Sequence, residues 1–339
     1  MSLAKPVGLI ANPASGRDIR RLVAHASVID NVEKANIVRR IIAVLDFLGV
    51  EEMVVMPETF GITERALSLL PQKPKMKVNF LDMRVNGDWT DTFRASEMMR
   101  GNVGAVISIG GDGTNRIIAK AGLDAPLMPI STGTNNVFPY MIEATIAALA
   151  VGSVALGAAD PARVTFRSKR VELLIDGELR DIALVEISAT THQFIGSKAI
   201  WRPDFVREIV ASVCAPYNIG LSSIPGAFYE IGQMDEGGAY VLIGDEGNRA
   251  VSPIAPGVLR EIKVKERKRL SNEELVEIRT SPSVIALDGE REIIVRGEER
   301  VRAKITRNGA RVIDYRKAIM EGFAGGLLSS SFHSSLQDK

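Results

Sequence analysis

The segment Ser108-Ile109-Gly110-Gly111-Asp112-Gly113-Thr114-Asn115 is the strongest indication of the fold class of this chain. It closes the continuous apolar run of residues 103–109 and leads into residues 115–121, which are predicted to form a helix. A buried strand, a glycine-rich turn and a helix in this order are typical of an open α/β sheet. Such sheets bind ligands at the carboxyl ends of their strands.

The same turn carries the densest chemical signal. Its three glycines have no Cβ atom, so backbone N–H groups can approach phosphate oxygens, and the N-terminus of the next helix favours an anion. Asp112 is predicted to be catalytic, either by accepting a proton from an attacking hydroxyl or by helping to hold Mg²⁺ beside a triphosphate. The alternative is a plain tight turn in which Asp112 caps the helix. Arg116 breaks the dinucleotide-binding spacing Gly-x-Gly-x-x-Gly, and the sequence has neither Gly-x4-Gly-Lys-Ser/Thr nor Gly-x-Ser-x-Gly.

Strands and helices alternate on both sides of this turn. The helix predicted over residues 32–48 has Val38, Ile41 and Leu45 on one face, and Gly49 is its expected end. Further helices are predicted at residues 63–70, 91–100 and 137–149. Apolar strands are predicted at residues 6–10, 51–56, 77–81 and 127–130. This pattern predicts an α/β N-terminal domain with a parallel sheet covered on both faces.

From about residue 160 the pattern changes to many short strands with turns such as Asp176-Gly177, Asp288-Gly289 and Asn308-Gly309. This predicts a mainly antiparallel β-sandwich C-terminal domain, interrupted by a helix over residues 203–213. The expected organisation is a nucleotide-binding domain at 1–158, a β-sandwich domain at 159–308, and a final segment at 309–339. That segment is expected to contain a helix, which could return to the first domain, and a frayed end.

Composition excludes several classes of protein. With 42 Lys and Arg against 41 Asp and Glu among 339 residues, nothing pulls the whole chain toward nucleic acid or an anionic membrane. A lone Cys214 and three histidines exclude a disulfide framework and a cysteine-rich or multi-histidine metal site. No secretory signal is visible, and the longest uncharged stretch, residues 144–159, is too short to span a bilayer. We therefore expect a cytoplasmic protein without nucleic-acid or membrane partners.

Two further loops are expected at the same edge of the sheet. One is Asn12-Pro13-Ala14-Ser15-Gly16 and the other is Ser131-Thr132-Gly133-Thr134-Asn135-Asn136, and each follows a predicted strand. Small residues, hydroxyls and amides suit phosphate and ribose oxygens, although either loop alone could equally be a capping loop. Three such loops after three parallel strands favour a ligand site.

These loops resemble those of the superfamily of NAD kinases, diacylglycerol kinases and sphingosine kinases. More narrowly, residues 130–139 and 193–201 resemble the acetoin-catabolism protein X branch of the ATP-NAD kinase family. The resemblance covers about residues 12–290 and implies ATP and NAD as ligands, Mg²⁺ as cofactor, and a homo-oligomer, either a dimer or a tetramer. It also implies that Asp112 activates the acceptor hydroxyl and that Gly110, Gly111, Gly113 and Thr114 face phosphate.

The sequence departs from the NAD kinases at two places. Their Asn-Glu pair, which contacts the dinucleotide, corresponds here to Val185-Glu186, and valine cannot replace the lost donor and acceptor. Asp288-Gly289-Glu290 resembles the Asp-Gly-Glu of the lipid kinases, and it is also a strong hairpin signal.

Several other features have a plainer explanation than function. The basic run of residues 263–269 is expected on the solvated face of a hairpin. His192 is expected in a loop near the cleft, and Phe194, Trp201 and Cys214 are expected to serve packing.

The leading hypothesis is a Mg²⁺-dependent phosphotransferase that moves phosphate from ATP or polyphosphate to a hydroxyl of NAD. Asp112 is its predicted catalytic residue, and the predicted binding residues are Asn12, Ser15, Gly16, Gly110, Gly111, Gly113, Thr114, Asn115, Thr132, Gly133, Thr134, Asn135, Asn136, Glu186, Asp288 and Glu290. No residue is assigned as a protein ligand to a metal. The alternatives are a kinase of a lipid or small polyol, and a nucleotide-binding accessory protein without catalysis.

Overall fold

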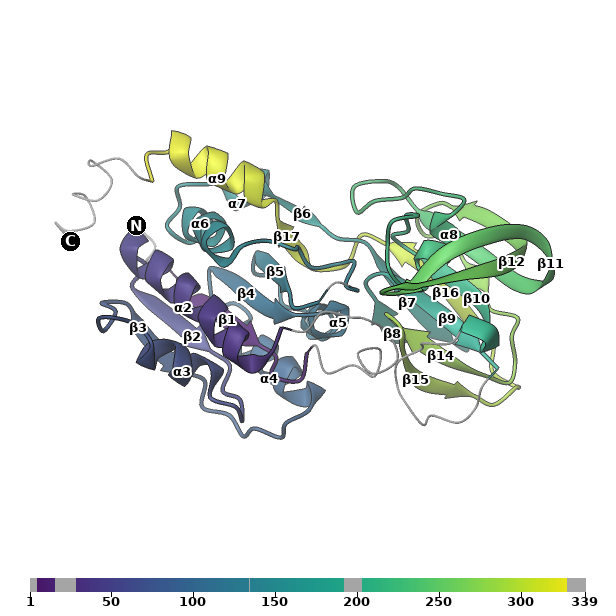
Figure 1. The fold of residues 1–339 in the computed structure, drawn as a ribbon, viewed down its shortest axis with the longest axis horizontal. Coiled ribbons are helices and arrows are strands. Elements are labelled where there is room, and N and C mark those ends of the chain that lie inside the picture. The colour runs from purple at the N-terminus through teal and green to yellow at the C-terminus, as the bar shows by residue number, and fades with distance from the viewer. Residues whose placement is uncertain (1–4, 16–28, 134, 192–202, 328–339) are drawn as a thin grey trace.

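The computed structural model describes residues 5–15, 29–133, 135–191 and 203–327 (Figure 1). Its first sheet has seven strands in the order β3-β2-β1-β4-β5-β17-β6. Neighbouring strands are parallel except β6, which pairs antiparallel with β17. The strands are β1 (Val7–Ala11), β2 (Glu52–Val55), β3 (Lys77–Phe80), β4 (Ala105–Gly110), β5 (Leu127–Ser131), β6 (Thr165–Arg167) and β17 (Arg311–Ile313).

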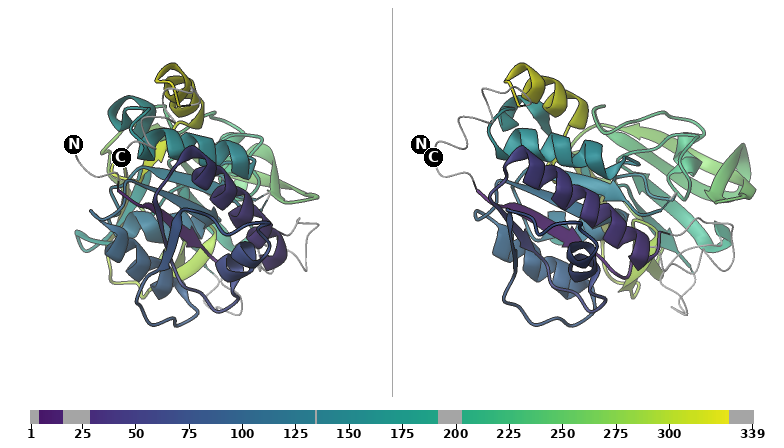
Figure 2. Two further views of the ribbon diagram at one scale, coloured as in Figure 1. Left: turned by 90° about the vertical axis from the view of Figure 1, so that its left-hand side faces the viewer. Right: turned by 60° about the vertical axis from the view of Figure 1, so that its left-hand side comes forward.

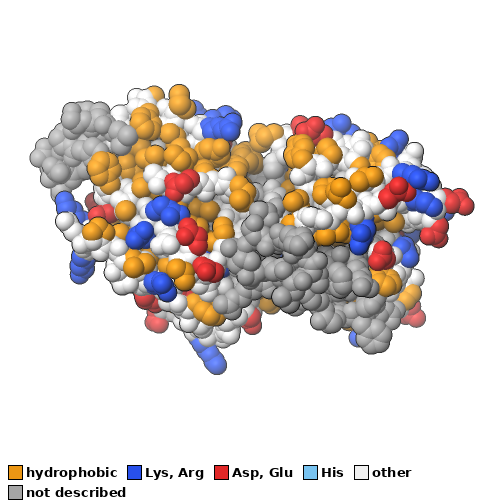
Figure 3. Space-filling view, viewed as in Figure 1, with side chains coloured by type: hydrophobic (Ala, Val, Ile, Leu, Met, Phe, Trp, Pro, Cys, Tyr) orange, Lys and Arg blue, Asp and Glu red, His pale blue; other side chains and the backbone are white. Residues whose placement is uncertain are grey.

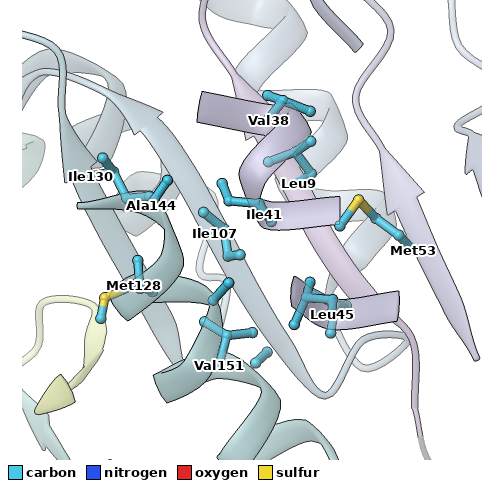
Figure 4. Close-up of a cluster of buried hydrophobic side chains, with 14 of the residues drawn as sticks. Leu9, Val38, Ile41, Leu45, Met53, Ile107, Met128, Ile130, Ala144 and Val151 are labelled. Atoms are coloured by element: carbon cyan, nitrogen blue, oxygen red, sulfur yellow. The ribbon is translucent and has the colours of Figure 1, made fainter. Parts of the chain in front are cut away.

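Helices cover both faces of this sheet (Figure 2). One face carries α2 (Asn31–Leu48), α3 (Ile62–Ser68) and α6 (Ala144–Ala155), and the other carries α4 (Trp89–Met99) and α5 (Asp112–Lys120). Figure 4 shows Val38, Ile41 and Leu45 of α2 in one buried cluster with Val151 of α6 and strand residues such as Ile107. As predicted, α2 ends at Gly49, which adopts a positive φ of 87°.

The second half of the chain forms two antiparallel sheets, in the orders β12-β11-β10-β9-β14-β15 and β13-β16-β7-β8. Side chains of β7 and β16 pack against those of β9, β10 and β14 in one core between the sheets. The strands are β7 (Arg170–Ile175), β8 (Glu178–Ala183), β9 (Glu186–Thr190), β10 (Val206–Ala211), β11 (Gly238–Ala255), β12 (Val258–Leu270), β13 (Val276–Glu277), β14 (Ser283–Leu287), β15 (Glu290–Val295) and β16 (Val301–Thr306). The predicted fold class, a parallel α/β part followed by antiparallel sheets, is confirmed.

The chain crosses between the two parts twice. It leaves the first sheet after β6 and returns after β16 to add β17 and α9 (Tyr315–Ala324). α9 packs on α6 so closely that a Cβ on Gly322 would lie 2.3 Å from Ser153 Oγ. Short helices α7 (Pro161–Val164) and α8 (Ser223–Gly226) and the 3₁₀ turn η1 (Pro203–Phe205) complete the described elements.

Three sequence-based expectations were wrong. Residues 206–211 form strand β10 and not a helix, because the β-branched Val206, Ile209 and Val210 suit a fully buried strand. The helix expected from residue 137 begins only at Ala144. Asn308-Gly309, expected to be a short turn between strands of the second domain, is the passage between sheets, where a Cβ on Gly309 would lie 2.2 Å from Ser168 Oγ.

The surface agrees with the interpretation of the basic run. Residues 263–269 lie on β12, where all but the buried Val264 are exposed. Figure 3 shows charged side chains of both signs at this end of the molecule. None of the helices in the described ranges is long and apolar enough to cross a membrane.

Candidate active site

Three predicted loops meet at one edge of the first sheet. The strand order reverses between β1 and β4, and open α/β sheets bind ligands in the crevice at such a point. Asn12, directly after β1, donates from its side chain to Thr114 Oγ1 at 2.9 Å and from its backbone to Ile109 O at 3.0 Å. After β5, Thr132 donates to Gly110 O at 3.3 Å and to Ser15 Oγ at 3.1 Å. The structure therefore joins the three loops by direct hydrogen bonds.

The three glycines of the turn differ in how much space their neighbours leave for a side chain. A Cβ on Gly110 would lie 2.5 Å from Thr114 Oγ1, and one on Gly111 would lie 2.7 Å from Asn136 Oδ1. Among the described residues, a Cβ on Gly113 would meet only the carboxylate of Glu290, with Oε1 at the ordinary contact distance of 3.7 Å. Neighbouring side chains thus require the first two glycines, whereas the surface above Gly113 is open toward Glu290.

Asp112 is the first residue of α5, and its carboxylate is directed at the loop after β5. Val137 N donates to both carboxylate oxygens at 3.1 Å, and Phe138 N donates to Oδ1 at 2.8 Å. These bonds explain why α6 starts later than predicted, since residues 137 and 138 turn their N–H groups to Asp112. In this arrangement Asp112 fixes the third loop to the start of α5.

Two predicted amide ligands have structural partners. Asn115 is fully buried, accepts from Ser108 Oγ at 2.7 Å and donates to Gly111 O at 2.9 Å. Asn136 donates to Ser131 Oγ at 2.9 Å and to Gly133 O at 3.3 Å. Both side chains shape the loops from within, and Asn135 lies half-buried in the same loop.

The two acidic residues of Asp288-Gly289-Glu290 occupy different environments. Asp288, in a turn at a φ of 50°, accepts from the N–H groups of Leu184, Val185 and Glu186 at 2.8–3.3 Å. Burial raises the pKa of the Asp288 carboxyl, and the charge of Arg116 and the three N–H groups oppose this rise. Glu290 begins β15, is half-buried, and places its carboxylate beside Gly113. Of these two residues, Glu290 is the one whose carboxylate lies beside the glycine-rich turn.

Residues 184–186, which contain the Val185-Glu186 pair that corresponds to the Asn-Glu pair of the NAD kinases, form hydrogen bonds within the protein. Val185 is 1% exposed, and Ser212 donates to the carbonyl of Val185 from its N–H and to that of Leu184 from its hydroxyl, both at 2.8 Å. Asp288 N also donates to Glu186 O at 2.9 Å, so these contacts use the N–H groups and the carbonyls of all three residues 184–186. Glu186 is also buried, at 5% exposure.

Sequence reasoning missed three charged residues near the site. Arg116 Nη1 lies 3.4 Å and Lys120 Nζ 2.7 Å from the two carboxylate oxygens of Asp181, which connects α5 to β8. Lys34 is buried beneath the loop after β1. It is spaced four, seven and eleven residues from Val38, Ile41 and Leu45, so a lysine on the apolar face of α2 was the available signal.

Several predicted residues fall outside the described ranges. These are Gly16 and Thr134 of the predicted site, and also His192, Phe194 and Trp201. Within the described residues, no group of three or more His, Cys, Asp and Glu side chains is placed to hold a metal ion.

Comparison with known proteins identifies both halves of the chain. Residues 7–153 match the ATP-NAD kinase N-terminal domain, and residues 169–308 match the acetoin catabolism protein X C-terminal domain. The chain is 36% identical over 325 residues to Acetoin catabolism protein X of Cupriavidus necator, a match that covers 92% of this chain and 90% of the relative.

Similar solved structures include two that are each 12% identical to this chain. Yeast NADH kinase complexed with NADH has a TM-score of 0.48 and is matched over 96% of this chain and 89% of its own. A diacylglycerol kinase of Bacillus anthracis has a TM-score of 0.45, over 91% and 96% respectively.

Proposed function

This chain belongs to the family of acetoin catabolism protein X, and on that premise we propose that it is a phosphotransferase. It moves a phosphoryl group from ATP, or from polyphosphate, to a hydroxyl group of an acceptor. The observation that carries the proposal is the junction of three loops at the reversal point of the sheet, with Gly113 open toward Glu290. The match of residues 7–153 to the ATP-NAD kinase N-terminal domain supports the same reaction class.

The residues of the site take distinct roles in this reaction. The N–H groups at the start of α5 bind phosphate oxygens, and Asp112 holds the loops in place around them. Glu290 takes the proton from the acceptor hydroxyl. The acceptor oxygen then forms a bond to the terminal phosphorus, and the bond between that phosphorus and ADP breaks.

Proteins bind Mg²⁺ through one or two carboxylates and the phosphates of the substrate, so the ion would be held here by those phosphates beside the carboxylate of Glu290. When bound, the ion neutralises negative charge on the phosphates.

NAD is the acceptor suggested by the family of the N-terminal domain. A specific observation favours a second candidate, a small polyol or a lipid. Residues 184–186 keep their N–H groups for Asp288, and Val185 supplies no polar side chain to a dinucleotide. The third possibility is a protein that binds nucleotides without catalysis. A homo-oligomer and a cytoplasmic location stay predictions from the sequence.

The test is to incubate the pure protein with ATP and Mg²⁺ and either NAD, a panel of small polyols or dispersed lipid, and to measure ADP, with NADP as an additional readout for NAD. Glu290→Gln is expected to lower turnover by about 10²–10⁴-fold while ATP binding, measured by calorimetry, is kept. Asp112→Asn is expected to weaken both, because it releases the loop after β5. Glu178→Gln, an exposed glutamate on β8, is the matched control and should behave as the wild type.

The arms of this experiment separate the alternatives. ADP formed with only one acceptor identifies that acceptor. Tight ATP binding without ADP in every arm would favour the non-catalytic protein. Absence of ATP binding would exclude ATP as the donor, and absence of phosphorylated acceptor with polyphosphate as well would overturn the proposal.

A further inference from the structure

We propose that Lys34 is a positioning residue whose ammonium group replaces a bound monovalent cation beneath the loop after β1. The side chain is 1% exposed and starts from the first turn of α2. Its Nζ lies 2.9 Å from the carbonyl oxygen of Asn12, 2.8 Å from that of Ser15 and 3.3 Å from that of Pro13. A fourth oxygen, Asn31 Oδ1, lies at 3.1 Å.

Among the described residues, four neutral oxygens surround this charge and form an electrostatic cage. A lysine ammonium is a compact point charge with three N–H donors, so four oxygens share three protons. Carbonyl oxygens arranged in this way also replace the hydration shell of K⁺ in selective channels. The cage therefore fits a monovalent cation of the size of ammonium or K⁺, and the lysine side chain supplies that cation permanently.

The cage sets the direction of the loop that contacts the other two loops of the site. The carbonyls of Asn12, Pro13 and Ser15 turn toward Lys34 and so away from any anion bound in front of the loop. The same loop bonds to Thr114 through Asn12 and to Thr132 through Ser15. The link from Lys34 to ligand binding rests on the proposed function, in which these loops hold the phosphates of ATP.

The first experiment tests the cage independently of any activity. Lys34→Ala removes the cation and leaves its space, and thermal unfolding is recorded at equal ionic strength in K⁺, NH₄⁺, Na⁺ and choline salts. We expect the midpoint of the variant to fall in Na⁺ and choline and to recover in K⁺ or NH₄⁺, while the wild type shows no such selectivity. Lys169→Ala is the matched control, since Lys169 is also fully buried but donates to the carbonyl of Gly237, directly before β11 in the second part of the chain. Loss of stability without selectivity among cations, as in the control, would overturn the cage.

The second experiment tests the positioning role. ATP affinity of Lys34→Ala, measured by calorimetry, is expected to be about tenfold or more weaker in Na⁺ and to recover in K⁺. Recovery of stability without any change in ATP affinity would overturn the positioning role but keep the cage. If the wild type binds no ATP, the proposed function fails, and the unfolding experiment still decides the cage.

If Lys34→Ala does not fold, Lys34→Met is the second variant to measure. Lys34→Met keeps the apolar stem and fills the space of the cation, so its ATP affinity should be low in every salt. Wild-type affinity in Lys34→Met would overturn the proposal.

Discussion

At the scale of single residues, the hydrogen bonds of two aspartates distinguish their structural role from the role proposed for Glu290. Asp112 and Asp288 both accept backbone N–H groups, and in both cases those bonds hold a neighbouring segment in place. Glu290 is half-buried and faces the glycine-rich turn. The sequence marks all three as acidic residues beside glycines, and only the contacts separate the two that organise the fold from the one that faces the presumed ligand.

Gly113 gives the sharpest test at this scale. Gly113→Ala places a methyl group in a helix where no neighbour is closer than 3.7 Å, so the free energy of unfolding should rise by up to about 1 kcal/mol. The same methyl group would stand where phosphate oxygens approach, and ATP affinity should fall about tenfold or more. Thermal unfolding and ATP calorimetry measure the two effects.

Gly111→Ala is the matched control for this prediction. Its Cβ would lie 2.7 Å from Asn136 Oδ1, so this variant should lose stability. Unchanged ATP affinity in a stable Gly113→Ala would place the phosphates elsewhere.

At the scale of helices and strands, the sequence was most informative where apolar patterns are continuous. The helix at 32–48 and the strand before the glycine-rich turn were predicted to within two residues because their apolar faces and glycine ends are local signals. β10 was mistaken for a helix because a short apolar run fits either structure. The start of α6 was misplaced because its cause, the bond from Phe138 to Asp112, joins residues 26 positions apart.

In the candidate site, too, local features could be predicted from the sequence and contacts between distant segments could not. Loops at the ends of parallel strands could be predicted to meet, since the topology brings such ends together. The burial of Asn115 and the bonds of Asp288 could not, because they depend on side-chain partners in distant segments. Lys34 carried a signal in its helical position, but its four oxygen partners could not be predicted from that position.

Lys169 lies buried in the connection between β6 and β7. Its titration should make the stability of the protein depend on pH. Lys169 Nζ donates to Gly237 O at 3.0 Å, and burial, with the nearby charge of Arg307, lowers the pKa of the Lys169 ammonium from 10.5 to about 8. Above pH 8 the unfolded chain therefore binds more protons at this residue than the folded protein. Its contribution to stability should rise with pH up to about 10.5, by at most about 1.4 kcal/mol per pH unit.

The measurement is denaturant unfolding between pH 7.5 and 9 for the wild type and Lys169→Met. The stability of the wild type relative to the variant should increase over this range. Burial raises the pKa of the Cys214 thiol to about 12, so this residue lowers the stability of the folded protein as the pH rises further. The measurement ends at pH 9 to keep this opposite effect small. Lys5→Met, which changes an exposed lysine, should show no such trend. A constant difference between wild type and Lys169→Met would contradict the prediction.

At the scale of the whole molecule, α5 connects the two parts of the chain. Its first turn carries the glycine-rich site, and its later residues Arg116 and Lys120 bind Asp181 on β8. Figure 1 shows α5 on the side of the first sheet that faces β8. The charge of Arg116 also acts on Asp288, whose turn leads into Glu290. One helix thus links the turn that is proposed to bind phosphate to the part of the chain that carries the proposed proton acceptor, Glu290.

Asp181→Asn tests this connection. Arg116 and Asp181 are only 3% and 8% exposed, and removal of one partner from a buried ion pair leaves the other charge uncompensated. The free energy of unfolding should therefore fall by about 3 kcal/mol, as measured by denaturant unfolding. Asp124→Asn is the control, because Asp124 pairs with Arg167 at the surface and its loss should cost less than about 1 kcal/mol. We expect the pair also to help place Glu290, so turnover should fall more than ATP affinity in Asp181→Asn. Equal losses of stability in the two variants would mean that α5 and β8 are held together by apolar packing, and the position of Glu290 would then need another cause.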